Sequence, residues 1–119
     1  MSMNFKKRRL EELIKEKIST LLLKGLKDPR LDVFITVLGV KLSGDGRSAR
    51  VSVSVIGSKK ERQAALAGLE SAHGYIQMRL GKEMRIKYIP HLIFLLDEGT
   101  EERVRFVHWM NEMEKKDRE

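Results

Sequence analysis

Apolar residues along this chain recur at helical spacing in its first part. Between residues 4 and 24 they fall three and four positions apart, which is typical of a helix with one buried stripe. These residues are Leu10, Leu13, Ile14, Ile18, Leu21 and Leu22. Asn4 can cap the start of this helix, and Gly25 followed by Asp28-Pro29 ends it. We expect the stripe to pack on a sheet.

Three further segments have strand character. Residues 33–42 are β-branched and apolar, and their alternation changes phase around Gly39, which predicts a strand with a bulge. Residues 43–46 form a turn, and residues 48–55 alternate cleanly, so these segments predict an antiparallel hairpin with one solvated face. Residues 86–96 are apolar nearly throughout and predict a third strand with Pro90 near its start. A run of this kind indicates that both faces of the strand are covered by other elements. Only the last segment of the chain is left to cover the second face.

A second helical pattern occupies residues 58–84. Ser58 and Glu61 form a capping box, and Leu66, Leu69, Ile76 and Leu80 recur behind it at helical spacing. Gly74 lies inside this pattern, where glycine costs ~1 kcal/mol relative to alanine. A close contact or a break in the helix should offset that cost. The periodicity is compatible with an unbroken helix and with a kinked one.

The end of the chain predicts one more helix. Gly99-Thr100 can open it, and residues 114–119 should fray at its end. Its apolar residues are Val104, Phe106, Val107, Trp109, Met110 and Met113. A chain of 119 residues builds a single modest core. We therefore expect one domain over residues 1–97, with residues 98–119 as a helix and tail that is packed on it or appended to it.

Charge is distributed unevenly over the chain. Residues 1–90 contain 19 Lys and Arg against 9 Asp and Glu, whereas residues 91–119 contain 5 against 8. A basic surplus confined to the first three quarters indicates a face that meets a polyanion, with RNA the first candidate. A solvated, heat-adapted surface explains any single cluster equally well. With no cysteine, no signal peptide and no long apolar run, the sequence predicts a cytoplasmic protein with no membrane contact.

Catalytic and metal-binding motifs are missing from the sequence. The three histidines lie at no metal-ligand spacing, and no Gly-X-Ser-X-Gly is present. We therefore expect no enzyme, no cofactor, no metal site and no small-molecule substrate. His73 would point toward the apolar face of an unbroken helix, where a satisfied, partly buried histidine and an RNA contact are equally good interpretations.

The order of the predicted elements and several local strings together resemble the bacterial ribosome-binding factor A family, from Arg8 to about Asp97. The strings are Lys27-Asp28-Pro29-Arg30-Leu31, Gly39-Val40, Leu42-Ser43-Gly44-Asp45, Ala49-Arg50-Val51, Ala72-His73-Gly74-Tyr75-Ile76, Leu80-Gly81-Lys82-Glu83-Met84-Arg85 and Ile89-Pro90-His91-Leu92-Ile93-Phe94. No single string is decisive, but their order and spacing are specific. After Asp97 the chain departs from the family pattern, which puts the role of its last segment in doubt.

The resemblance implies an α+β fold, a two-layer type II KH-like domain. In it a three-stranded mixed sheet carries helices on one face, in the order α-β-β-α-kink-α-β, with a C-terminal helix added here. It implies that Ala72-His73-Gly74 is a helix kink where ordinary KH domains carry a Gly-X-X-Gly loop. It also implies a monomeric, non-enzymatic factor that binds the small (30S) ribosomal subunit and its 16S rRNA during late maturation and supports rRNA processing, above all in the cold.

Charge and resemblance together predict an RNA-binding surface. Its expected residues are Lys6, Lys7, Arg8, Arg9, Arg47, Arg50, Lys59, Lys60, Arg62, His73, Gly74, Tyr75, Arg79, Lys82, Arg85 and Lys87. With one Trp, two Tyr and four Phe, the chain offers no interleaved stacking platform, so shape and charge should dominate recognition. Two alternatives remain: a general KH-type RNA-binding protein, and a protein-interaction module that uses the C-terminal helix through Phe106, Trp109 and Met113.

Overall fold

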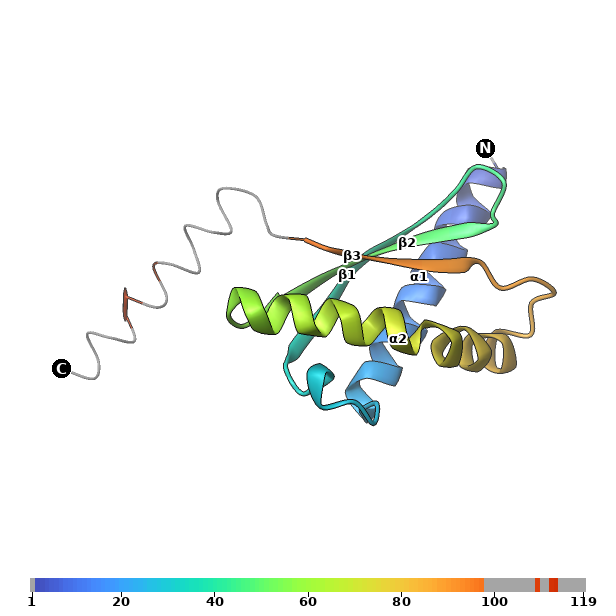
Figure 1. Ribbon diagram of the computed structural model, residues 1–119. Coiled ribbons are helices and arrows are strands. Elements are labelled where there is room, and N and C mark those ends of the chain that lie inside the picture. The colour runs from blue at the N-terminus through green and yellow to red at the C-terminus, as the bar shows by residue number, and fades with distance from the viewer. Residues whose placement is uncertain (1, 98–108, 110–111, 114–119) are drawn as a thin grey trace.

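The computed structural model describes residues 2–97, 109 and 112–113. Its elements follow in the order α1 (Ser2–Lys24), the 3-10 helix η1 (Pro29–Leu31), β1 (Phe34–Leu42), β2 (Ser48–Ile56), α2 (Lys59–Met84) and β3 (His91–Leu96). The strands form one sheet in the order β1-β2-β3, in which β1 and β2 are antiparallel and β2 and β3 parallel. Figure 1 shows the two long helices beside this sheet. The expected α+β fold with a three-stranded mixed sheet is confirmed.

The hairpin is antiparallel and has the predicted bulge. Pairing between β1 and β2 shifts between Val37 and Gly39, at the point where the apolar alternation changes phase. Asp45 holds the turn, because its carboxylate accepts hydrogen bonds from the Ser43 hydroxyl at 2.7 Å and the Arg47 amide at 3.1 Å. Both bonds favour the charged carboxylate, so they hold the pKa of Asp45 below its ordinary value, with the Ser43 bond the larger cause.

Both helices cover the same face of the sheet. Ile14 and Ile18 of α1 meet Leu69 and Ile76 of α2 in a single buried cluster with the inward side chains of the strands. The inward strand residues are Val37, Val40, Leu42, Ala49, Val51, Val53, Leu92 and Phe94. The stripe predicted for residues 4–24 therefore packs on the sheet as expected.

No element in the described part of the chain covers the second face of the sheet. On β3, Leu92 and Phe94 are buried whereas the alternating Ile93 and Leu95 are exposed. The expectation of cover on both faces is thus unmet among residues 2–97. The segment expected to supply that cover, and the helix predicted there, lie outside the described residues except at positions 109, 112 and 113, which are helical.

Helix α1 begins earlier than the sequence predicted. It starts at Ser2, so Asn4 lies inside the helix and does not cap it. Its end agrees with the prediction, because Gly25 has φ 86°, a left-handed conformation that glycine adopts without steric cost. The Gly25 amide donates to the Leu22 carbonyl at 3.2 Å and closes the last turn.

Helix α2 is continuous from Lys59 to Met84, so the expected division into two helices around Gly74 is wrong. Strong helix formers flank the glycine and no proline interrupts the ladder, which explains the continuity. Figure 1 shows the axis of α2 changing direction in its second half, so the element is a bent helix. Gly74 makes no close contact either: a β-carbon added there would meet nothing within 4 Å.

Gly68 is the glycine of α2 that allows close packing. A β-carbon at this buried position would lie 3.0 Å from Leu31 Cδ2 and 3.4 Å from Arg30 Cβ. The η1 helix thus approaches α2 through the space left by the missing side chain. Sequence reasoning singled out Gly74 because it lies in the middle of a motif, and overlooked Gly68.

The third strand is shorter than predicted. It starts at His91, whereas residues 86–90 form the connection from α2. Arg85 adopts a left-handed conformation at the end of α2, and Pro90 has no amide to donate to a ladder. The strand begins where the His91 amide can donate to the Arg47 carbonyl, at 2.8 Å.

The predicted capping box is present at the start of α2. The Glu61 amide donates to the Ser58 hydroxyl at 3.1 Å, and the Ser58 amide donates to Glu61 Oε1 at 3.0 Å. Ser58→Ala is expected to lower the free energy of unfolding by about 1 kcal/mol, because the Glu61 amide loses its acceptor. Urea titration measures this loss. Gln63→Ala, on the exposed side of the same helix, is the control and should leave the midpoint unchanged.

The capping box of Ser58 and Glu61 makes a pH-dependent contribution to the free energy of unfolding. The hydrogen bond from the Ser58 amide is the first cause that holds the pKa of Glu61 below its ordinary value of 4.5. Because folding lowers this pKa, the contribution is complete above that value and is lost as the pH falls through the folded-state pKa. The loss of stability in Glu61→Ala, which removes the carboxylate that accepts from the Ser58 amide, should therefore shrink in acid when urea titrations at neutral and acidic pH are compared.

Candidate nucleic-acid interface

Three segments that are distant in the sequence meet at one end of the molecule. The first turns of α1 lie beside the hairpin, since the Leu42 amide donates to Glu11 Oε2 at 2.7 Å. The hairpin turn lies beside the start of β3 through the bond from the His91 amide to the Arg47 carbonyl, at 2.8 Å. Figure 1 shows the N-terminus, the hairpin turn and the connection from α2 to β3 on the same side of the molecule.

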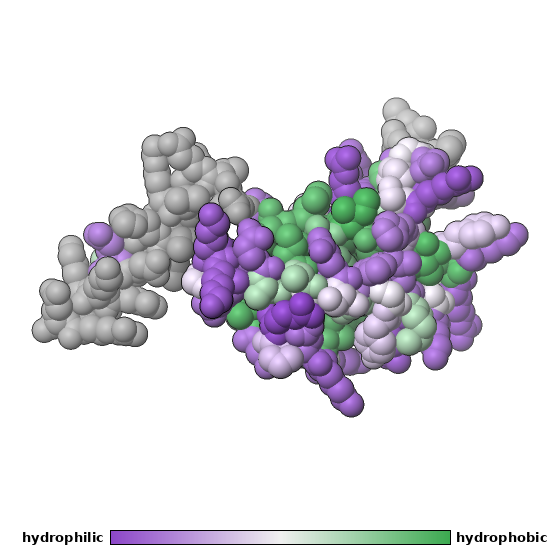
Figure 2. Space-filling view, in the orientation of Figure 1, coloured by the Kyte–Doolittle hydropathy of each residue, from purple (hydrophilic) through white to green (hydrophobic). Residues whose placement is uncertain are grey.

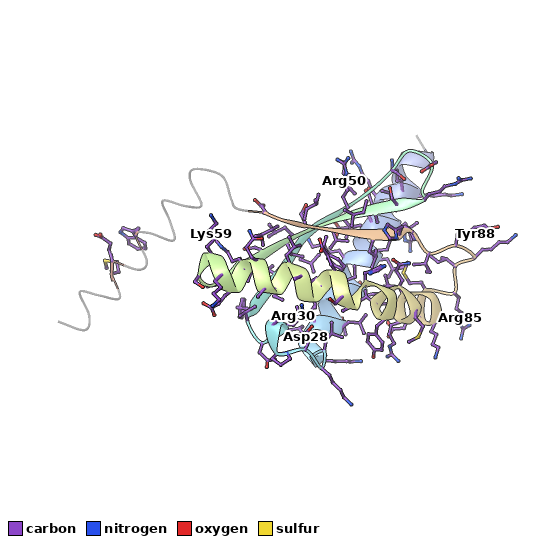
Figure 3. The ribbon with its side chains drawn as sticks, viewed as in Figure 1. Asp28, Arg30, Arg50, Lys59, Arg85 and Tyr88 are labelled. Carbon is purple, nitrogen blue, oxygen red and sulfur yellow. The ribbon has the colours of Figure 1, made fainter. Side chains whose placement is uncertain are left out.

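Basic side chains gather at this end, which we call the basic end. Lys7 is half-buried and the others are exposed. Its members are Lys6, Lys7, Arg8 and Arg9 of α1, Arg47 of the hairpin turn, Lys82 of α2, and Arg85 and Lys87 of the connection that follows. Figure 3 shows Arg85 projecting from this end into open space.

The cations of the basic end have no acidic partner within the described residues. The ion pairs among the described residues join Lys17 to Glu83 at 3.8 Å, Arg30 to Asp28 at 2.7 Å and Arg79 to Glu83 at 3.4 Å. All three involve other cations. The positive charge of the basic end therefore stays available to a polyanion.

Other residues of the predicted surface lie elsewhere. Lys59, Lys60 and Arg62 start α2 at the opposite end of the molecule, as the label of Lys59 in Figure 3 shows. Arg50 is on the open face of the sheet and points away from α2. Arg79 is engaged with Glu83 on its own helix. The structure thus brings together only part of the predicted set.

The Ala72-His73-Gly74 motif lies in the middle of α2. His73 is half-buried, with its Nδ1 2.7 Å from the Glu70 carbonyl oxygen. Its ring meets the ring of His91 edge to face, with centroids 5.5 Å apart. The intramolecular partners agree with the satisfied, partly buried histidine. Gly74 and Tyr75 are exposed.

A hollow lies where the loop after α1 meets α2. It has a volume of about 510 Å³ and is lined by Gly25, Leu26, Lys27, Asp28, Ser71, Ala72 and Tyr75. Asp28 lies in its wall and is paired with Arg30, since Asp28 Oδ1 accepts from the Arg30 amide and from Arg30 Nε, each at 3.0 Å. The Arg30 side-chain bond is the main cause that lowers the pKa of Asp28 and raises the pKa of Arg30. The pair therefore links the end of the loop to the first turn of η1.

The predicted set omits two exposed residues that a nucleic-acid partner could contact, Tyr88 and Lys41. Tyr88 is 77% exposed at the basic end, and Lys87 Nζ lies 5.6 Å from its ring centroid. Tyr88 was overlooked because the sequence predicted a strand from residue 86, whereas residues 86–90 form a connection. Lys41 lies opposite Arg50 on the open face of the sheet. The alternation of the two predicted strands could have indicated this pairing.

Residues 2–97, 109 and 112–113 lack two other kinds of site. No group of three or more His, Cys, Asp and Glu residues in this part of the chain is placed to hold a metal ion. No helix there combines the length and the apolar character needed to cross a membrane.

Comparisons with known proteins point to one family. The family model described as ribosome-binding factor A matches residues 6–109. The ribosome-binding factor A of Dictyoglomus thermophilum is 41% identical over 111 residues, which cover 93% of this chain and 92% of that protein. The one from Brevibacillus brevis is 45% identical over 93 residues, with 78% and 76% covered.

Solved structures agree with this likeness. The crystal structure of ribosome-binding factor A from Thermus thermophilus superposes with a TM-score of 0.69 at 30% identity, covering 79% of this chain and 98% of that one. A second match is a homology model of the Thermus thermophilus factor fitted into a cryo-EM map of a 30S complex, with a TM-score of 0.55, 30% identity, and 76% and 89% covered. The family match, the relatives and the shared fold together show that this chain belongs to the ribosome-binding factor A family.

Proposed function

We propose that this protein binds the small ribosomal subunit by seating its basic end on structured rRNA. The observation that supports the proposal is the meeting of α1, the hairpin turn and the connection from α2 to β3 at one end of the molecule, where eight Lys and Arg side chains have no acidic partner among the described residues. The 30S complex of the Thermus thermophilus relative supports this choice of partner.

The surface favours recognition by charge and shape. Lys and Arg side chains on several elements can neutralise phosphates without reading base edges, and the loop aromatic Tyr88 can stack on one unpaired base. In line with its family, the protein would act late in subunit maturation, support processing of the rRNA and matter most in the cold. It would do so as a binding protein in the cytoplasm, without catalysing a reaction.

Salt dependence tests the electrostatic part of this proposal. If ~6 phosphates are contacted, the logarithm of the association constant should fall with the logarithm of the salt concentration with a slope of about −4 to −5. Binding to isolated small subunits between 50 and 300 mM KCl measures the slope. A slope near zero would exclude phosphate neutralisation as the main source of affinity.

Competition separates this function from general RNA binding. Immature small subunits should displace the protein from a labelled unstructured RNA at much lower concentrations than mature subunits or the same RNA unlabelled. Sedimentation of cell lysate should place the tagged protein with free small subunits. Equal competition by all three would favour a general KH-type RNA-binding protein. Accumulation of precursor rRNA in cells that lack the protein, greatest in the cold, tests the processing role.

A further inference from the structure

The hollow between the loop after α1 and the middle of α2 lies apart from the basic end. Figure 3 shows Asp28 and Arg30 beside the middle of α2, whereas Arg85 lies at the far end of that helix. The hollow has a volume of about 510 Å³. Ligand pockets in proteins commonly measure ~300 to 1,000 Å³, so a planar group such as a nucleobase has room here.

Hydrogen bonds connect the two sides of this hollow. Arg30 Nη2 donates to Asp28 Oδ2 at 2.7 Å and to Ser71 Oγ at 3.3 Å, and so joins the loop to α2. Gly68 admits η1 against the same helix, since a β-carbon there would lie 3.0 Å from Leu31 Cδ2. Because the protein itself links the loop to α2, a ligand bound between them has less chain to order.

The acidic residue of the hollow is already compensated. Asp28 is the one acid among the described lining residues, and its two carboxylate oxygens accept from the Arg30 guanidinium. A negatively charged strand would therefore meet no unpaired carboxylate here. Figure 2 shows strongly apolar surface over the strands, whereas the loop after α1 and the facing side of α2 carry hydrophilic and intermediate side chains. The hollow is thus not an apolar groove.

Tyr75 brings an aromatic ring to the hollow. Its side chain is 49% exposed and lines the hollow together with Ser71, which lies four positions earlier on the same side of α2. Ser71 Oγ accepts from Arg30, so its hydroxyl proton is left to donate to a ligand. An aromatic ring beside a polar group is the combination that proteins use to hold an unstacked base, through its face and its edge.

We propose that this hollow receives an unpaired base of the rRNA, stacked on the ring of Tyr75 and hydrogen-bonded at its edge by the Ser71 hydroxyl. The site rests on the proposed function, which supplies rRNA as the partner. It adds a contact with a base to the contacts with phosphates at the basic end. Stacking accepts every base, so the site should prefer single strands to duplexes and distinguish little among sequences.

Amide chemical shifts of the isolated full chain test where a single strand binds. The probe is a single-stranded RNA of ~6 nucleotides, and a duplex of the same length is the comparison. The single strand should shift the amides of Leu26, Ser71 and Tyr75, which line the hollow, and leave residues 59–63 unmoved. The duplex should leave the hollow unmoved. Shifts confined to the basic end, equal shifts with both RNAs, or no shift at all would overturn the site.

Two substitutions at one position test the stacking contact. Tyr75→Leu should weaken binding of the single strand by about 5- to 100-fold, whereas Tyr75→Phe keeps the ring and should stay within about twofold of the natural chain. Residue 75 is exposed, so both variants preserve the core. Unchanged affinity in Tyr75→Leu, or equal losses in both variants, would overturn the contact.

Failure of this site and failure of the proposed function give different results. Residue 75 carries no charge in the natural chain or in either variant, so the salt slope on isolated small subunits stays the same in all three. A slope near zero in the natural chain would count against the basic end. Binding of the short single strand measures the hollow.

Discussion

Replacing Arg47, Arg85 and Lys87 with glutamine is expected to weaken binding to isolated small subunits about 100- to 500-fold at 0.1 M salt. Each phosphate contact adds ~0.7 to 0.9 to the steepness with which the logarithm of the association constant falls with the logarithm of the salt concentration. Loss of three contacts at 0.1 M salt should therefore lower the association constant by about two to nearly three orders of magnitude. All three side chains are exposed at the basic end, where α2 and the hairpin turn approach β3. The salt slope should become shallower by ~2 to 3 at the same time.

A control variant with the same change in net charge separates position from total charge. Lys27, Lys59 and Lys60 are exposed and lie away from the basic end, and their replacement by glutamine also removes three charges. This control should lose only the long-range part of the attraction, well under tenfold at 0.1 M salt, where charges more than ~10 Å apart are screened. Equal losses in the two variants would show that net charge, and not the basic end, determines affinity.

The second large effect concerns stability. Gly68→Leu should lower the free energy of unfolding by about 1 to 3 kcal/mol, because the new side chain enters the space that Leu31 and Arg30 occupy. The same substitution at Gly74, Gly74→Leu, should be neutral or stabilising by up to ~0.8 kcal/mol, since it removes a glycine from an exposed helix position with nothing within 4 Å.

Urea titrations of the two leucine variants give the comparison. They differ from the natural chain by the same atoms on the same helix, so the difference between them isolates the contact with η1 from helix propensity. A Gly74→Leu variant less stable than Gly68→Leu would show that the bend of α2 depends on Gly74, as the resemblance to the family suggests.

The interface was only partly predictable. Net charge and its concentration in residues 1–90 indicate a polyanion partner, but they assign Lys59 and Arg85 to one surface, whereas α2 separates them by its whole length. Hydrogen bonds between Leu42 and Glu11 and between His91 and Arg47 decide which cations lie together. Such pairings join residues distant in sequence, and no local pattern encodes them.

By itself the sequence determined what depends on neighbouring residues: the capping box at Ser58, the bulge near Gly39, the turn at residues 43–46 and the buried stripes of both helices. These features follow from hydrogen bonds and apolar spacing within a few positions. Tertiary structure alone decided that η1 packs against α2 at Gly68, that β3 begins only at His91, and that one face of the sheet is left open by the described residues. Each of these depends on which surfaces meet when the layers pack, because packing and long-range pairing outweigh local preferences of ~1 kcal/mol.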